Sequence, residues 1–129
     1  MLDPMEALAR WHAATDDGSP VDLRLRLALI EEECAEVRSE LLAAIEGRGS
    51  LPRLAKELAD LLYVVYGTAD RLGIPLDRVF QLVHEANMRK VDPRTGRVER
   101  RADGKVLKPE GFRDVSLEEI EAVVRAARP

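Results

Sequence analysis

The segment Lys56-Glu57-Leu58-Ala59-Asp60-Leu61-Leu62-Tyr63-Val64-Val65-Tyr66-Gly67 predicts a core-facing helix that carries two acids within its apolar side. At 3.6 residues per turn, one apolar stripe is formed by Leu54, Leu58, Leu61 and Val65. Glu57 and Asp60 border this stripe in helical angle. Burying a carboxylate is costly unless it is paired or bound to a metal, so these two acids mark a candidate site.

A second acidic cluster, Glu32-Glu33-x-x-Glu36, lies on the predicted helix before it. The opposite side of that helix is apolar and consists of Leu27, Ile30, Cys34, Val37, Leu41 and Ile45. Because a short loop joins the two helices, we expect them to be antiparallel neighbours. Facing carboxylates repel one another unless a cation lies between them, and such hard oxygen ligands suit Mg²⁺ or Mn²⁺. Two other interpretations stay open: the first cluster as a solvated acidic face, and Glu57 in an ion pair with an arginine of the preceding helix.

The chain as a whole predicts an all-α bundle of four or five helices. Of its 129 residues 46% are hydrophobic but only 4% aromatic, so the core must consist of aliphatic side chains. Caps, prolines and glycines place helices from Asp3-Pro4 to before Asp16, from Ser19-Pro20 to about Glu46, from Leu51 to Leu72, from Leu76 to Arg89 or Lys90, and from Ser116 to about Ala127. Residues 91–115 predict an irregular basic loop, with a small hairpin across Val98–Val106. By length, residues 1–129 form a single domain.

Charge is unevenly distributed along the chain. Residues 87–114 hold nine Arg or Lys against five Asp or Glu, a net charge of +4, whereas the whole chain carries −4. An acidic helical body with one basic segment lacks the continuous basic face that nucleic acid requires, so we expect no nucleic-acid partner. No apolar run reaches the roughly 20 residues of a membrane span. The N-terminus has no signal-peptide pattern and the single Cys34 excludes an internal disulfide, so we expect a cytoplasmic protein with no membrane partner.

The basic segment supplies candidate phosphate ligands. Asn87 and Lys90 form an i, i+3 pair at the end of a predicted helix, and Lys105 and Lys108 follow in Gly/Pro-rich sequence. Lysines in such loops act as point charges for phosphate, although ordinary solvated lysines produce the same pattern. Trp11 can stack on a nucleobase or anchor a core. These five residues are therefore candidate substrate-binding residues.

The two acidic motifs together resemble those of the all-α nucleoside triphosphate pyrophosphohydrolases. The hallmark of that superfamily is EExxE followed by ExxD, and here Leu29-Ile30-x-Glu32-Glu33-x-x-Glu36 precedes the 56–67 segment quoted above. The superfamily includes MazG, the dimeric dUTPases and phosphoribosyl-ATP pyrophosphohydrolase. The resemblance continues through Asn87-Met88-x-Lys90, Asp103-Gly104-Lys105 and Lys108-Pro109-Glu110-Gly111-Phe112, and it covers about residues 8–113.

The resemblance implies hydrolysis between the α- and β-phosphates of a nucleoside triphosphate, which yields a monophosphate and pyrophosphate. It implies that Glu33, Glu36, Glu57 and Asp60 bind two or more Mg²⁺ ions, with Mn²⁺ as a possible substitute. Glu32 would share these metals or position the attacking water, and either Glu32 or Glu33 would act as the catalytic base. The lysines and Asn87 would hold the phosphates or the sugar.

The resemblance also implies a homodimer or homotetramer and a nucleotide substrate. We expect a house-cleaning MazG-like enzyme with dUTP as the leading substrate. Phosphoribosyl-ATP is the alternative substrate. A function of another class, a non-catalytic helical dimerisation module, also stays open.

Overall fold

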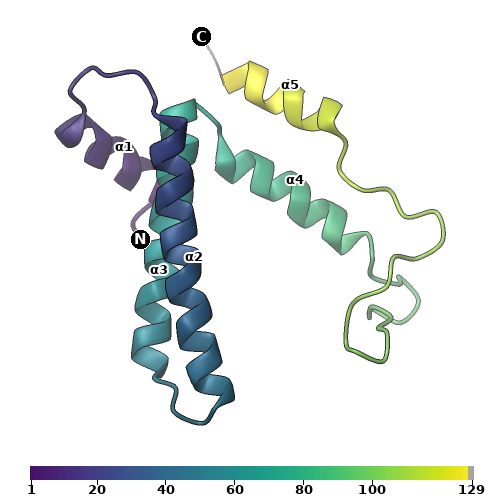
Figure 1. The fold of residues 1–129 in the computed structure, drawn as a ribbon. Helices are drawn as coiled ribbons and strands as arrows, with labels where there is room; N and C mark the ends of the chain where they lie inside the picture. The colour runs from purple at the N-terminus through teal and green to yellow at the C-terminus, as the bar shows by residue number, and fades with distance from the viewer. Residues whose placement is uncertain (128–129) are drawn as a thin grey trace. The chain divides into compact units, whose positions relative to one another are not determined.

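The computed structural model describes residues 1–127, which contain five α-helices and no strand (Figure 1). This confirms the predicted all-α fold. The chain divides into two compact units, Met1–Ile74 and Pro75–Pro129, which we describe separately. Within residues 1–127, no helix combines the length and the apolar composition that crossing a membrane requires.

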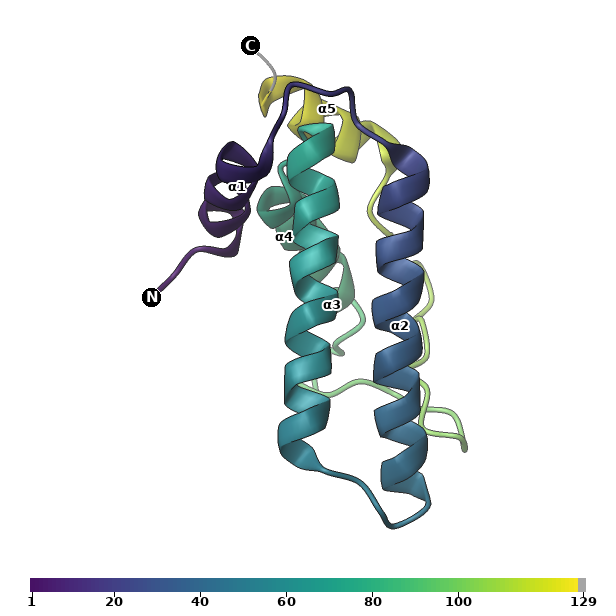
Figure 2. The ribbon, with the colours of Figure 1, turned by 60° about the vertical axis from the view of Figure 1, so that its left-hand side comes forward.

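The first unit is a long helical hairpin with one short helix against it. α1 (Pro4–Thr15), α2 (Leu23–Ile45) and α3 (Leu51–Leu72) follow in chain order. α2 and α3 lie side by side and antiparallel along their length, and α1 packs against α3 (Figure 2). This arrangement turns one side of α2 toward the acidic segment of α3.

The helix ends of this unit follow mostly from local capping. The Asp3 carboxylate accepts a hydrogen bond from the Met5 N–H at 2.8 Å, and the Ser50 hydroxyl accepts one from Arg53 N–H at 3.4 Å. Both predicted starts and the predicted end of α3 at Leu72 are confirmed. The prediction that α2 begins at Ser19-Pro20 was wrong. α2 begins at Leu23 because Asp22 caps it, with its carboxylate 3.1 Å from the Leu25 N–H.

A close backbone contact sets the turn between α2 and α3. A Cβ on Gly49 would lie 2.7 Å from Ala44 Cα and 2.8 Å from Ala44 Cβ, closer than real side-chain contacts. Only glycine therefore allows the chain to pass this close to the last turn of α2. The short turn holds the two long helices as neighbours.

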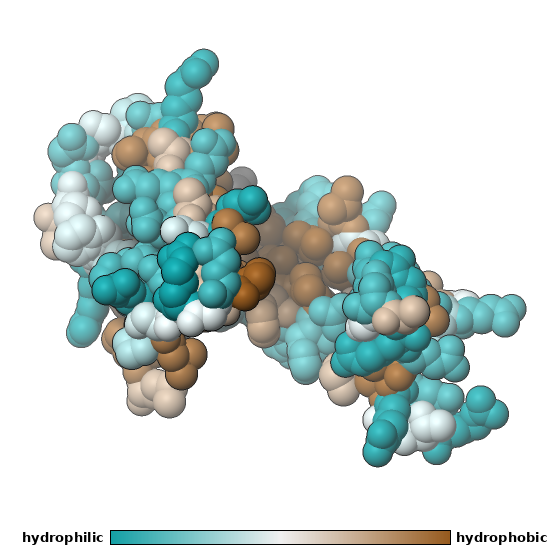
Figure 3. Space-filling view, turned by 60° about the horizontal axis from the view of Figure 1, so that its bottom comes forward, coloured by the Kyte–Doolittle hydropathy of each residue, from teal (hydrophilic) through white to brown (hydrophobic). Residues whose placement is uncertain are grey.

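The core of the first unit is narrow. Leu8, Ala43, Gly67 and Ala69 are buried, while three of the four predicted stripe residues of α3 are only half-buried. The prediction that Leu58 belongs to the core stripe was wrong, because Leu58 is 45% exposed. The expected apolar side of α2 is exposed as well, at Leu27, Cys34, Leu41 and Ile45. Figure 3 shows apolar residues reaching the surface among hydrophilic ones.

The second unit contains α4 (Leu76–Met88), α5 (Leu117–Ala127) and the long basic loop between them. α4 and α5 contact each other. The predicted capping box of α5 is present, because Ser116 Oγ accepts from the Glu119 N–H at 3.1 Å and the Glu119 carboxylate accepts from the Ser116 N–H at 3.4 Å. α5 thus begins where the sequence indicates.

The predicted hairpin across Val98–Val106 is reduced to short pairings. Arg100 and Val106 form an isolated antiparallel bridge around the turn at Asp103-Gly104, and a further bridge joins Asp92 to Arg97. Neither extends into a strand in the described residues. The loop is therefore irregular, as expected.

Candidate functional site

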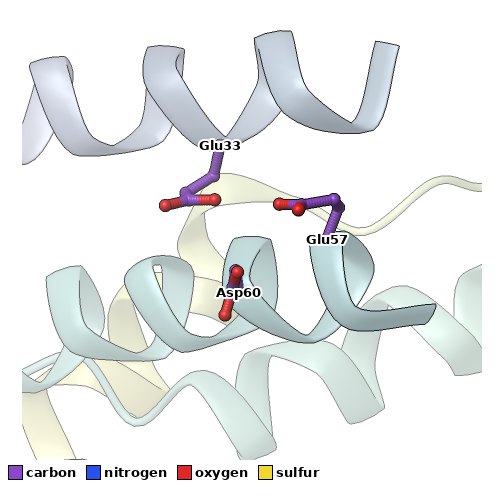
Figure 4. Close-up of side chains that lie close together, drawn as sticks. All are labelled: Glu33, Glu57 and Asp60. Carbon is purple, nitrogen blue, oxygen red and sulfur yellow. The ribbon is translucent and has the colours of Figure 1, made fainter. Parts of the chain in front are cut away.

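Three predicted metal ligands converge between α2 and α3. Glu33 extends from α2 toward α3, where Glu57 and Asp60 lie one turn apart (Figure 4). One carboxylate oxygen from each residue can be chosen so that all three lie within 4.8 Å of one another. Oxygens around one octahedral Mg²⁺ lie about 3 to 4 Å apart, so a small contraction of these side chains suits a hard divalent cation.

The two acids of α3 are partly enclosed. The exposed fraction of the side chain is 16% for Glu57 and 38% for Asp60. Lys56 Nζ lies 2.6 Å from Asp60 Oδ2 and 4.0 Å from Glu57 Oε1. The alternative of an ion pair between Glu57 and an arginine of α2 is not seen, since among residues 1–127 Lys56 is the cationic side chain within 4.0 Å. An adjacent lysine, and no arginine, therefore balances part of the negative charge.

The clustering of acids affects the pKa of Glu33 and of the neighbouring Lys56. Partial removal from water raises the pKa of Glu33 above its usual 4.5, and the negative charges of Asp60, Glu32 and Glu57 raise it further, while Lys56 opposes them. The hydrogen bond to Asp60 raises the pKa of Lys56 above its usual 10.5, with the charges of Asp60 and Glu57 adding to this effect. Both shifts describe a site with excess negative charge, which a divalent cation would relieve.

The structure does not bring the other two predicted ligands into this group. Glu32 and Glu36 are exposed on α2, outside the set of oxygens that lie within 4.8 Å of one another. Glu32 still acts on the centre through its charge. Glu33 differs from Glu32 and Glu36 in its position around the helix. It lies on the same side of α2 as the half-buried Arg26 and Val37, seven residues before it and four residues after it.

Trp11 packs against Tyr63 of α3. Its ring packs edge-on against Tyr63, with ring centroids 6.4 Å apart and an interplanar angle of 70°. Tyr63 is one helical turn beyond Asp60. Trp11 is 51% exposed, so this aromatic pair is partly open to solvent.

A cavity that the sequence did not indicate is lined in part by Trp11. It has a volume of about 370 Å³ and is bordered by α1, the α1–α2 loop and the ends of α2 and α3 nearest that loop. Arg26 and Arg71 line it, as does His12, whose Nδ1 lies 2.6 Å from Asp70 Oδ2. Two features of the sequence could have indicated this cavity. Arg26 lies seven residues before Glu33 and therefore on the same side of α2, and Gly67 lies in the interior of a helix.

The predicted phosphate ligands of the second unit gather around one aromatic ring. Lys90 Nζ lies 5.5 Å and Lys108 Nζ 5.8 Å from the centroid of Phe112, within the range of a cation–π contact. Lys90 Nζ also donates to Asn87 Oδ1 at 3.0 Å. Lys105 is exposed and follows the turn at Asp103-Gly104. Three of the four residues thus form one basic cluster.

A family comparison identifies the scaffold. The family model of phosphoribosyl-ATP pyrophosphohydrolase matches residues 9–87, more than half of the chain. The chain belongs to the phosphoribosyl-ATP pyrophosphohydrolase family. The match includes Trp11, both acidic clusters and Asn87, and it crosses from the first unit into the second. No individual curated protein matches the chain.

Membership of the phosphoribosyl-ATP pyrophosphohydrolase family confirms the predicted resemblance to the all-α nucleoside triphosphate pyrophosphohydrolases, to which this family belongs. It supports a nucleotide pyrophosphohydrolase activity of the general type. Enzymes of this family typically depend on a divalent metal, and the carboxylates between α2 and α3 are the cluster that suits one.

Proposed function

We propose that the chain hydrolyses the bond between the α- and β-phosphates of a nucleoside triphosphate and releases a nucleoside monophosphate and pyrophosphate. The observation that carries this proposal is the convergence of Glu33, Glu57 and Asp60 between two helices of a pyrophosphohydrolase scaffold. A pure scaffold would be more stable with apolar residues at two partly enclosed positions of α3. Their carboxylates therefore support a catalytic role.

In this proposal Glu33, Glu57 and Asp60 hold Mg²⁺, and Mn²⁺ can replace it. Glu36, one turn beyond Glu33 on α2, would complete the ligand set. Metal ions at this position would neutralise phosphate oxygens and orient a water for in-line attack. The charge they bring would also compensate the repulsion that raises the pKa of Glu33.

We assign the general base to Glu32. Glu33 contributes an oxygen to the group of ligands, whereas Glu32 is exposed beside it and its oxygens are not committed to that group. Glu32 can therefore take the proton of the attacking water while Glu33 holds the metal. Glu33 as the base is the alternative, and comparing the metal affinity of the two Gln variants separates these roles.

The remaining predicted site residues would contact other parts of the substrate. Trp11 would stack on the base, because its ring is partly exposed and packs against Tyr63, which is one helical turn beyond Asp60. Lys90, Lys105 and Lys108, together with Asn87, would hold the phosphates or the sugar. This requires the two units to work as one domain over residues 1–129, which the family match across both units supports. The exposed leucines on α2 also support assembly into a homodimer or homotetramer.

Two substrates fit this chemistry. The family match favours phosphoribosyl-ATP. The segment with Asp103-Gly104-Lys105 and Lys108-Pro109 lies outside the matched residues and resembles MazG-like enzymes, which favours dUTP. Both would be cleaved by the same carboxylates, so the choice rests on contacts beyond the metal centre.

Pyrophosphate release from a panel of substrates tests the proposal. The panel contains phosphoribosyl-ATP, ATP, dUTP and dCTP, each with Mg²⁺ or Mn²⁺. We expect Glu57→Gln to lower kcat at least 100-fold with an unchanged circular dichroism spectrum, because it removes a metal ligand. Glu31→Gln, which removes an exposed acid from α2, serves as the matched control. Full activity of Glu57→Gln would contradict the site, and an inactive wild type across the panel would favour the non-catalytic helical module.

A further inference from the structure

Two lysines of the second unit reach the same aromatic ring. Lys90, just beyond the end of α4, has its Nζ 5.5 Å from the centroid of Phe112, and Lys108 Nζ lies 5.8 Å from that centroid. Within residues 1–127, no carboxylate oxygen lies within 4.0 Å of either ammonium group. Like charges repel one another, and here two of them gather without a counter-ion. The lysine pair is therefore a suitable partner for an anion.

One long-range hydrogen bond joins the chain neighbours of this pair. Arg89 Nε donates to the backbone carbonyl of Arg113 at 2.8 Å, across 24 residues of the chain. Arg89 directly precedes Lys90, and Arg113 directly follows Phe112. The bond thus closes the loop between α4 and α5 (Figure 1) beside the contact of Lys90 with the ring. Closing a loop of this length costs conformational entropy, and a bond at its base offsets part of that cost.

The guanidinium of Arg89 is enclosed, at a cost that no ion pair offsets. Its Nη2 is shielded from solvent and has no hydrogen-bond acceptor. Among the described residues, no carboxylate lies within 4.0 Å of its nitrogens. The C-terminus of a helix attracts cations and Arg89 is the C-cap of α4, but the hydrogen bond of its side chain goes to the loop. Stabilisation of the helix end therefore does not account for the position of this guanidinium.

A tight turn connects the anchored Arg113 to Lys108. The Phe112 N–H donates to the Pro109 carbonyl at 3.0 Å, and Gly111 has a φ of 75° within this turn. Glycine adopts a positive φ at the third position of such a turn without strain, so the turn is locally stable. Anchoring Arg113 therefore sets the position of Phe112 and, through the turn, the position of Lys108.

The cavity beside Lys90 has charged residues of both signs in its lining. It has a volume of about 530 Å³, and its charged residues are Arg89, Lys90, Arg94, Asp92, Glu99 and Glu110. Equal numbers of cations and acids leave no net positive charge to draw an anion in. Two ammonium groups held in place bind a phosphate group without the entropic cost of ordering a mobile loop. We therefore expect the placement of the lysines, and not the net charge, to decide whether an anion binds.

We propose that Arg89 is a positioning residue for the phosphate-binding lysines. It ties the loop to the end of α4 and so places the Phe112 ring within reach of both ammonium groups, which lets Lys90 and Lys108 act on one phosphate group. Arg89 acts through the lysines, since its Nε donates to the loop and its Nη2 is shielded from solvent. The proposal rests on the proposed function, which assigns the substrate phosphates to these lysines, and it adds the residue and the ring that set their arrangement.

Calorimetric titration of the full-length, metal-free protein with inorganic pyrophosphate tests this role. We expect Arg89→Met to raise the Kd about tenfold and Arg89→Lys to raise it by a similar factor, because lysine keeps the charge but loses the planar donor that meets the loop. In a Lys108→Met background, Arg89→Met should change the Kd by less than about twofold, because no pair is left to position. Arg78→Met, which removes an exposed arginine of α4, is the matched control. Full rescue by Arg89→Lys, or additive losses in the double variant, would overturn the proposal.

Fluorine NMR measures whether the ring moves. The chain has two phenylalanines, so labelling with fluorophenylalanine gives one signal for Phe112 and one for Phe80, which is exposed on α4. We expect both Arg89 variants to shift the Phe112 signal and to leave the Phe80 signal unchanged. Shifts of both signals would show a general loss of structure and would overturn the positioning role.

A variant that leaves Arg89 in place tests the ring directly. Phe112→Leu keeps an apolar side chain but removes the aromatic face that both ammonium groups contact. We expect it to weaken pyrophosphate binding about two- to fivefold. Binding as tight as in the wild type would contradict the proposed arrangement of the lysines.

Hydrolysis of triphosphates is a separate outcome. If no triphosphate is hydrolysed but pyrophosphate binding follows the expected pattern, the proposed function fails and the positioning role of Arg89 stands. If triphosphates are hydrolysed but the wild type does not bind pyrophosphate, or the Arg89 variants bind it as the wild type does, the positioning role is overturned and the proposed function stands.

Discussion

Lys56 and Asp60 form an ion pair within the candidate metal site, with Nζ 2.6 Å from Oδ2. The two residues are four positions apart on α3, so the helix itself holds them together. Any metal bound by Asp60 must compete with this ammonium group. The lysine thus limits how tightly the site binds a cation.

Replacing Lys56 should strengthen metal binding. We expect Lys56→Met to bind Mn²⁺ about two- to fivefold more tightly, because the Lys56 side chain is largely exposed and such pairs contribute at most about 1 kcal/mol. Isothermal titration calorimetry of the metal-free protein measures the change. Arg53→Met removes an exposed cation of α3 outside the cluster. The same gain in that variant would show that net charge, and not the Lys56–Asp60 pair, controls affinity.

Stabilisation by Mg²⁺ should depend on pH. The pKa of Glu33 is raised in the folded protein, so the folded state holds this proton more tightly than the unfolded chain. Protonated Glu33 therefore contributes to the free energy of unfolding at low pH, and this contribution is lost as the pH rises through the raised pKa. Metal binding needs the deprotonated carboxylate, so the rise in Tm produced by Mg²⁺ should be a few degrees larger at pH 7.5 than at pH 5.

Thermal melts with and without Mg²⁺ at the two pH values measure this effect. Glu33→Gln cannot titrate and loses a ligand, so it should show a smaller Mg²⁺ response and a weaker pH dependence. A response to Mg²⁺ that is the same at pH 5 and pH 7.5 in the wild type would contradict the role of Glu33.

Gly67 should tolerate alanine but not a large side chain. In Gly67→Ala the new Cβ displaces the flexible end of Arg26 slightly, and the gain in helix propensity offsets the cost of this displacement. The free energy of unfolding should therefore stay within about 1 kcal/mol of the wild type. Gly67→Leu must also displace Leu8 and His12, and it should lose about 1 to 3 kcal/mol. Urea unfolding measures both values. Equal stability of the two variants would show that the three helices do not meet closely at this position.

Gly49 should be intolerant even of alanine. The new Cβ would lie 2.7 Å from the backbone Cα of Ala44, which cannot move without distorting the end of α2. We expect Gly49→Ala to lower the free energy of unfolding by about 1 to 3 kcal/mol. Gly47→Ala is the comparison, because its Cβ meets nothing within 4 Å and it carries only the cost of a positive φ of 78°. Unfolding curves in urea that match the wild type for Gly49→Ala would refute this turn geometry.

Local chemistry explains why much of the fold was predictable. The bounds of α3 follow from the Ser50 cap and from Gly73, whose φ of 68° ends the helix. The capping box at Ser116 places α5 in the same way. The start of α2 shows the limit of capping rules, since both Ser19-Pro20 and Asp22 are suitable N-terminal caps for this helix. The cap at Asp22 forms, while the acids at Asp16 and Asp17 hold the preceding residues in turns.

The candidate site was predictable only in part. Glu57 and Asp60 were evident because an acid beside an apolar stripe is costly, and both side chains are partly enclosed. For α2 the helical period separated an acidic from an apolar side but did not show which residues face α3. Glu33 faces it, Glu32 and Glu36 are exposed, and Leu27 is exposed on the side expected to be apolar core.

The sequence by itself determined the five helices, most of their caps and the acidic pair of α3, because each depends on interactions between residues a few positions apart. Only the tertiary structure decided that Glu33 joins this pair and that Arg26 remains without a counter-ion beside Gly67. These two outcomes depend on how α2 is rotated against α3 and on how closely α1 approaches. That rotation is set by the packing of three helices around one glycine, and no local pattern encodes it.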